Sequence, residues 1–215
     1  MEQDPRELIT SLKKFAAELS ISIPDSSIPL FCSYLSQLKQ WNKAINLTAI
    51  QNDQEIVVKH FVDSLAGLQV IDINDEANIL DVGSGAGLPA FPLKFVHPPL
   101  SVELVEPSEK KGSFLRYVIG SLGLQKVTVA TMKLEDYVSR RNSQRLFDYI
   151  VVRAFKVDQL GGWLKELLKP AGKVVLYRSA KVERDFKLTG LALIKEVEYE
   201  LPAKYGRRVL SVFAK

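Results

Sequence analysis

The segment from Asp81 to Pro89 reads Asp-Val-Gly-Ser-Gly-Ala-Gly-Leu-Pro, and its residue types and spacing suit it to bind a ligand. It follows an apolar run at residues 78–82 that predicts a buried strand, and it precedes a predicted helix at residues 89–96. Glycines between a strand and a helix let the backbone turn sharply and approach a ligand closely. The segment therefore predicts a binding loop, although a tight turn without a ligand would suit the same glycines.

The spacing of the glycines separates two classes of cofactor. The dinucleotide fingerprint G-x-G-x-x-G would need a glycine at position 88, where the chain has Leu88. The observed pattern is G-x-G-x-G over residues 83–87, with Asp81 two residues before it. This pattern favours S-adenosylmethionine, whose amino group Asp81 would help to hold. Glu106, 19 residues after Gly87, is placed to accept hydrogen bonds from both ribose hydroxyls of an adenosine.

Alternating apolar runs and amphipathic stretches predict the elements that position this loop. Strands are expected at 78–82, 101–105, 126–130, 147–152, 171–177, 193–201 and 208–213, with helices at 89–96, 108–122 and 157–168. Strands that alternate with helices predict a parallel, doubly wound sheet, and the last two strands predict an antiparallel pair. The expected fold is α/β and Rossmann-like, with a mostly parallel seven-stranded sheet, as in class I methyltransferases.

The residues before this sheet predict a helical extension. Helices are expected at 5–19 and at 54–68, and a cap at Ser26 or Ser27 predicts a helix between them with an apolar stripe of Phe31, Tyr34, Leu35, Leu38 and Trp41. In the second helix Trp41 is expected in the core and Asn42 as a hydrogen-bonding corner. We therefore expect residues 1–70 to pack on the core as an extension, and residues 71–215 to form the S-adenosylmethionine-binding domain.

Composition excludes several classes of protein. With 47% hydrophobic and 25% charged residues the chain can bury a core. The acidic start lacks the apolar segment of a secretory signal, and no apolar run approaches the roughly 18 residues of a membrane span. Cys32 is the single cysteine, and His60 and His97 lie far apart in the sequence, which argues against a zinc site. We expect a cytoplasmic protein without a metal.

The charge is distributed unevenly along the chain. Residues 153–215 carry 14 Lys and Arg against 7 Asp and Glu, whereas the preceding 152 residues carry 15 against 18. This asymmetry is typical of a surface that meets a polyanion, but lysines gathered on solvated elements would give the same count. The candidates for phosphate contacts are Lys156, Arg178, Lys204, Arg207 and Arg208.

Four segments in order give the chain a family resemblance: 41–48 (WNKAINLT), 60–65 (HFVDSL), 79–89 (ILDVGSGAGLP) and 153–155 (RAF). With these motifs the chain resembles the glucose-inhibited division protein B family, the small-subunit ribosomal RNA methyltransferase G group. The resemblance implies methylation of guanine N7 in 16S ribosomal RNA, with S-adenosylmethionine as donor. The partner would be this RNA or an assembly intermediate of the small subunit, and we expect a monomer.

The resemblance also implies cofactor contacts at Gly83 and Leu88, at Leu134 and Glu135 in the loop after the third strand, and at Arg153 after the fourth. Without it, Glu135 would read as a helix-start acid and Arg153 as a solvated charge. The full expected cofactor set is Asp81, Gly83, Gly85, Leu88, Glu106, Leu134, Glu135 and Arg153. Three segments depart from the family pattern: Ala90, Glu106-Pro107-Ser108 and Tyr177-Arg178-Ser179.

His60 and Asp63 stand three residues apart, so a helix would place them on one face as a possible acid/base pair. A structural role is the favoured interpretation. Guanine N7 already has a lone pair and loses no proton on methylation, so no general base is needed and no catalytic residue is assigned. The alternatives are a methyltransferase for another RNA, a protein or a small molecule, a nicotinamide-dependent oxidoreductase, and a non-catalytic RNA-binding module.

Overall fold

The computed structural model describes residues 5–73, 77–140, 146–153, 157, 160–183 and 185–215. Their centre is a seven-stranded sheet in the order β3-β2-β1-β4-β5-β7-β6. The strands are β1 Asn78–Val82, β2 Ser101–Val105, β3 Val127–Ala130, β4 Phe147–Arg153, β5 Leu168–Arg178, β6 Ala192–Glu200 and β7 Arg207–Ala214. Strands β1 to β5 are parallel, and β7 pairs antiparallel with β5 and β6. The expected fold class is confirmed.

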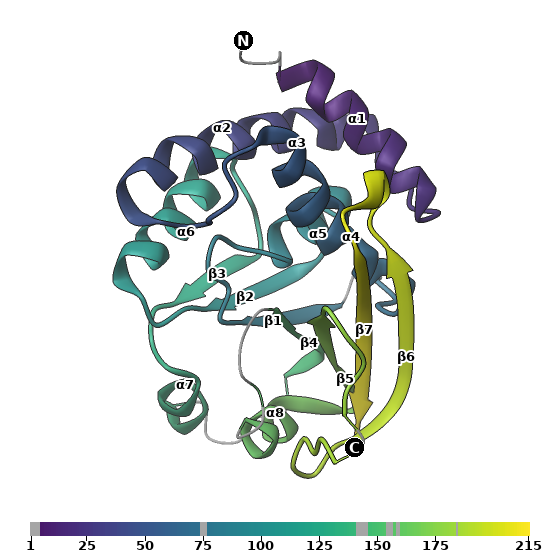
Figure 1. Cartoon of the computed structure of the whole chain (residues 1–215). Helices are drawn as coiled ribbons and strands as arrows, with labels where there is room; N and C mark the ends of the chain where they lie inside the picture. The colour runs from purple at the N-terminus through teal and green to yellow at the C-terminus, as the bar shows by residue number, and fades with distance from the viewer. Residues whose placement is uncertain (1–4, 74–76, 141–145, 154–156, 158–159, 184) are drawn as a thin grey trace.

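Helices cover both faces of the sheet (Figure 1). The N-terminal helical elements are α1 Pro5–Glu18, η1 Asp25–Ser27, α2 Ile28–Ile45, α3 Asp53–Ile56, η2 Val57–Val62, α4 Asp63–Leu65 and η3 Ala66–Gln69. The later ones are α5 Ala90–Val96, α6 Glu109–Ser121, α7 Leu134–Arg140, α8 Gly161–Leu167 and η4 Pro202–Lys204. Helices α2, α5 and α6 lie on one face of the sheet, and α7 and α8 lie on the other.

Side chains of β1 alternate between these two layers, as the pleat of a strand requires. Ile79 packs in the cluster under α2 and α5, whereas Leu80 and Val82 pack in the cluster under α7 and α8. Asp81 therefore points to the same side as Ile79, toward the N-terminal helices. Because both faces are covered, the parallel strands read as nearly continuous apolar runs.

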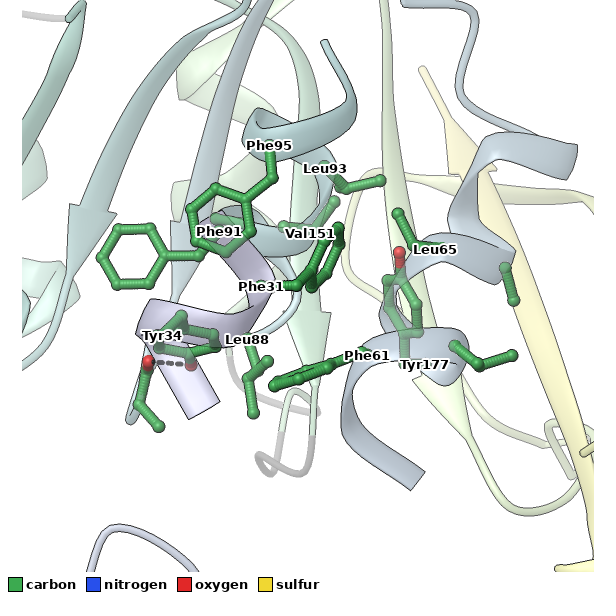
Figure 2. Packing of buried hydrophobic residues seen from close by; sticks show 14 of the residues in the cluster. Phe31, Tyr34, Phe61, Leu65, Leu88, Phe91, Leu93, Phe95, Val151 and Tyr177 are labelled. Atoms are coloured by element: carbon green, nitrogen blue, oxygen red, sulfur yellow. Dashed lines mark hydrogen bonds between the residues drawn. The ribbon is translucent and has the colours of Figure 1, made fainter. Parts of the chain in front are cut away.

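Aromatic side chains join the N-terminal helices to the sheet domain (Figure 2). The ring of Phe31 in α2 lies 5.1 Å from that of Phe95 in α5 and 5.4 Å from that of Phe61, between ring centroids. Tyr34 and Phe91 meet edge to face at 5.6 Å. The helices and the sheet share one hydrophobic cluster. The expected division at residue 70 stays a prediction.

Several details of the expected elements differ in the structure. The third helix spans residues 53–69, and its middle, Val57–Val62, is a π-helix. The hydroxyl of Ser27 does not cap α2 but donates to the carbonyl of Phe95 at 2.7 Å. Strand β5 begins at Leu168 rather than at residue 171, because Leu168 already pairs with Phe147 before the register shifts.

Two helices differ more strongly from the expectation. Helix α8 begins at Gly161 rather than at residue 157, and a Cβ at Gly161 would lie 2.3 Å from the backbone nitrogen of Thr189, so its start packs tightly on that segment. Helix α7 stands where a loop was expected, although Glu135 alone would have indicated the start of a helix. Its buried residues Leu134, Tyr137 and Val138 have helical spacing, which is the sequence signal that would have predicted it.

Candidate cofactor site

The glycine loop lies between β1 and α5, as expected, and all three of its glycines have positive φ: 71° at Gly83, 56° at Gly85 and 88° at Gly87. A Cβ at Gly87 would lie 2.2 Å from the ring of Phe91, so this glycine lets the loop pack on α5. A Cβ at Gly85 would meet only the carbonyl of Gly83, at 3.8 Å. Gly85 is therefore required for its backbone conformation, and the space beside it is open.

Hydrogen bonds fix the loop to its neighbours. The backbone N–H groups of Gly83 and Ser84 donate to the carbonyl of Val105, at 2.8 and 3.2 Å. The Tyr34 hydroxyl, from α2, donates to the carbonyl of Ala86 at 2.6 Å (Figure 2). Burial raises the pKa of Tyr34, so this hydroxyl keeps its proton. The sequence indicated Tyr34 only as part of an apolar stripe; a phenol in such a stripe needs a partner, and that was the missed signal.

Asp81 is fully buried at the end of β1. Its Oδ2 accepts from the backbone N–H of Ala90 at 3.2 Å, whereas within the described part of the chain its Oδ1 has no hydrogen-bond partner. Burial raises the pKa of Asp81 to about 7, although the Ala90 N–H and the charge of Arg153 act in the opposite direction. A buried carboxylate oxygen without a partner is costly, and an ammonium group would satisfy it.

Glu106 connects the end of β2 to the glycine loop. Its Oε2 accepts from the N–H of Gly85 and its Oε1 accepts from the N–H of Ser108, both at 2.9 Å. Ser108 in turn caps α6. Each carboxylate oxygen keeps a second lone pair, so the role expected toward a ribose stays a prediction.

A cavity of about 260 Å³ opens beside the loop on the α7 face of the sheet. It is lined by Val82, Gly83, Val105, Pro107, Lys133, Leu134, Glu135 and Leu160. Leu134 and Glu135 thus lie at this cavity, but in the first turn of α7 rather than in a loop, because the helix buries Leu134. Leu88 lies on the other side of the sheet, in the aromatic cluster.

Arg153 ends β4 directly after Val152, which pairs with Val82, so it stands level with Gly83. Its guanidinium turns toward the N-terminal helices. It donates to the carbonyl of Lys59 at 2.6 Å and to the Ser64 hydroxyl at 3.2 Å, and it forms an ion pair with Asp63 at 3.2 Å. Its expected contact with a cofactor stays a prediction.

His60 and Asp63 both face Arg153. The other nitrogen of His60, Nε2, lies 2.7 Å from the Thr48 hydroxyl. Burial, and then the charge of Arg153, lower the pKa of His60 to about 3, so the ring is neutral near pH 7. These contacts support the structural interpretation. Asn42 is the expected corner: its amide bonds the N–H and the carbonyl of Thr48, each at 2.9 Å.

Four of the expected phosphate-contact residues come together at the edge of the sheet that bears the glycine loop. Arg178 ends β5 and pairs with Val209, and Arg207 begins β7. Lys204 lies in the turn between β6 and β7, which also reaches this edge. Lys204 and Arg207 are exposed, whereas Arg208 Nε lies 3.9 Å from Asp63. Lys156 and Phe155 lie outside the described residues.

Tyr177, which departs from the family pattern, contacts the N-terminal helices. The Tyr177 hydroxyl donates to the carbonyl of Ser64 at 2.9 Å, and a Cβ at Gly67 would lie 2.0 Å from its oxygen. The following Arg178 lies over the ring of Phe186, with 5.1 Å between guanidinium carbon and ring centroid. The Tyr177 side chain is thus accommodated against Gly67 of the N-terminal helices.

A second cavity, of about 250 Å³, lies between α2 and residues 48–56. Across the ranges that the structure describes, no three His, Cys, Asp or Glu side chains are grouped to hold a metal ion. Among the helices that are described, none is long and apolar enough to cross a membrane.

Comparisons with known proteins identify the family of the chain. A family model described as rRNA small subunit methyltransferase G matches residues 27–207. The protein of that name from Geobacter sulfurreducens is 37% identical over 207 residues, which cover 93% of this chain and 94% of the relative. The one from Lactococcus lactis subsp. cremoris (strain SK11) is 34% identical over 207 residues, covering 92% and 85%.

Solved structures show the same fold at low sequence identity. A SAM-dependent methyltransferase from Aquifex aeolicus superposes with a TM-score of 0.54 at 18% identity, over 85% of this chain and 98% of that one. TrmN from Thermus thermophilus superposes with a TM-score of 0.54 at 19% identity, over 82% and 52%.

Proposed function

The chain belongs to the ribosomal RNA small subunit methyltransferase G family and is an S-adenosylmethionine-dependent methyltransferase, and we propose that its target is N7 of a guanine in 16S ribosomal RNA. The observation that carries the cofactor part is Asp81, a buried carboxylate with an unpartnered oxygen beside an open glycine loop. The guanine N7 target rests on the family resemblance.

The residues present fit the cofactor on both faces of the sheet. We place the adenine in the 260 Å³ cavity, against Leu134 and Glu135, and the ribose near Glu106. The methionine part of the cofactor would then cross the end of β1 at Gly83 and Gly85, and its amino group would reach Asp81 Oδ1. Leu88 and Arg153 complete the proposed set on the side of the N-terminal helices.

When bound, S-adenosylmethionine supplies a methyl group on a positively charged sulfur. Guanine N7 offers a lone pair and releases no proton, so the protein needs to orient the two groups and exclude water rather than supply a base. His60 suits this account, since it is neutral and already bound to Thr48 and Arg153. We assign no catalytic acid or base.

The RNA is proposed to lie along the edge that carries Arg178, Lys204, Arg207 and Arg208, with Lys156 as a further candidate from the sequence. The exposed cations lie at the same edge of the sheet as the glycine loop, with β4 and β5 between them, so one bound RNA would present its base to the cofactor. We further propose that the enzyme acts as a monomer, in the cytoplasm, on 16S RNA or an assembly intermediate.

The test of the target uses small ribosomal subunits from a strain that lacks the gene. Borohydride reduction and aniline treatment cut RNA at N7-methylguanine, so we expect one new cut that requires both the protein and S-adenosylmethionine. A methyl group found by mass spectrometry on a ribose oxygen or an exocyclic amine would contradict the proposal, because a proton would then have to leave.

A further inference from the structure

The Asp63 carboxylate lies near polar side chains from three strands of the sheet. It stands on α4, and its side chain is 5% exposed. The Tyr199 hydroxyl of β6 donates to its Oδ1 at 2.7 Å, and Arg153 of β4 lies 3.2 Å from its Oδ2. Arg208 of β7 is 3.9 Å away. One carboxylate therefore joins the N-terminal helices, the end of β4 and the C-terminal hairpin.

Arg153 stands near two buried carboxylates. Asp63 is its ion-pair partner, and the backbone carbonyl of Lys59 and the Ser64 hydroxyl hold the guanidinium on that side. Asp81 pairs with Val151 of β4, and Arg153 follows two residues later, so its side chain leaves β4 on the same face of the sheet as Asp81. The charge of Arg153 accordingly lowers the pKa of Asp81. Asp81 also carries the unpartnered Oδ1. A buried guanidinium released from Asp63 would be an uncompensated charge next to a free carboxylate oxygen.

We propose that Asp63 and Tyr199 are positioning residues that hold the Arg153 guanidinium away from Asp81, so that Asp81 Oδ1 stays available to the amino group of the cofactor. The inference rests on the proposed cofactor site. Tyr199 fixes the carboxylate through a hydrogen bond to Oδ1, which leaves Oδ2 directed at Arg153. Because Tyr199 and Arg208 belong to the hairpin, the cofactor site depends on how that hairpin packs on α4.

The first experiment compares Tyr199→Phe with Tyr149→Phe by calorimetric titration of S-adenosylmethionine. Both tyrosines are 8% exposed, but the Tyr149 hydroxyl bonds the N–H of Asp72, near the opposite edge of the sheet. We expect Tyr199→Phe to weaken cofactor binding about fivefold, a fraction of what a hydrogen bond to a charged group is worth. Tyr149→Phe should bind as the wild type does.

The second experiment asks whether Tyr199 acts through Arg153. Arg153→Lys is expected to weaken binding by itself, and adding Tyr199→Phe should weaken it no further, because the guanidinium that Tyr199 positions is already gone. Circular dichroism and thermal unfolding check that each variant is folded. Asp63→Asn, if folded, should weaken binding about tenfold, more than Tyr199→Phe, since it removes the ion pair itself.

The outcomes separate the inference from the proposed function. Unchanged affinity in a folded Tyr199→Phe, an equal loss in Tyr149→Phe, or additive effects in the double variant would overturn the inference while the wild type still binds S-adenosylmethionine. A wild-type protein that does not bind S-adenosylmethionine would overturn the proposed site, and the inference with it.

Discussion

The two halves of the ligand-bearing edge are held together in different ways. In the half that carries the glycine loop, most partners are close in the sequence and backbone groups make most of the bonds: Gly85 and Glu106 are 21 residues apart, and the Tyr34 hydroxyl, 52 residues from Ala86, is the exception. In the half that carries the hairpin, Tyr199 reaches Asp63 across 136 residues, side chain to side chain. A sequence motif can predict contacts of the first kind, whereas contacts of the second kind are visible only in the folded structure.

The largest expected effect is in the glycine-loop half. Gly85→Val should abolish S-adenosylmethionine binding and leave the fold intact, because the added side chain enters space that the cofactor needs while its Cβ meets no close neighbour. The positive φ would cost about 1–2 kcal/mol of stability.

Gly123→Val is the matched control. Gly123 also has a positive φ, 62°, and open space around it, but it lies in the turn after α6, away from the glycine loop. Both variants should lose similar stability, and only Gly85→Val should lose binding in calorimetry. A folded Gly85→Val with wild-type affinity would remove the loop from the cofactor site.

Asp81 should make cofactor affinity depend on pH. Its pKa of about 7 means that the carboxylate forms as the pH rises from 6 to 8, and affinity should rise over this range. Calorimetry across these pH values checks the trend, and Asp81→Asn should bind weakly at every pH. An equally steep rise in Asp81→Asn would assign the titration to another group.

The raised pKa of Asp81 has the opposite effect on stability: cofactor affinity should rise with pH, whereas the free energy of unfolding should fall. Because the folded-state pKa exceeds the ordinary value of 3.8, protonated Asp81 stabilises the fold at low pH, and this contribution is lost as the pH rises toward 7. The free energy of unfolding of the wild type, compared with Asp81→Asn in urea, should therefore fall between pH 4 and 7.

A smaller effect is expected in the hairpin half. Arg207→Glu should weaken binding to 16S RNA, lower the salt dependence by about one unit of slope, and leave S-adenosylmethionine affinity unchanged, because the residue is exposed and contacts phosphate in our account. The control is Lys126→Glu, which changes an exposed charge directly before β3. If filter binding shows the same loss for both, the RNA does not lie on the hairpin.

The smallest effect is expected at the junction of the two halves. His60 has a pKa of about 3, so kcat at saturating cofactor should not change between pH 6 and 8 through its titration. His60→Gln should lower kcat only a few-fold, through the lost support of Thr48 and Arg153. A bell-shaped profile that His60→Gln flattens would restore it as a general base.

The sequence predicted what local patterns encode. Alternating apolar runs predicted each strand of the described sheet, and the G-x-G-x-G spacing with Asp81 predicted the loop between β1 and α5. It did not predict α7, whose short apolar stripe was read as a loop, or the hydrogen bond from Tyr34 to Ala86. The direction of Arg153 also could not be predicted, because it depends on Asp63 and Ser64, which only the fold brings near.

The most direct test of the account is a crystal structure with S-adenosylhomocysteine, the demethylated product. We predict its amino group within hydrogen-bond distance of Asp81 Oδ1 and its adenine in the cavity against Leu134 and Glu135. Arg153 should keep its ion pair with Asp63. An adenine bound elsewhere, or an Arg153 that pairs with Asp81 while the ligand is present, would contradict the account.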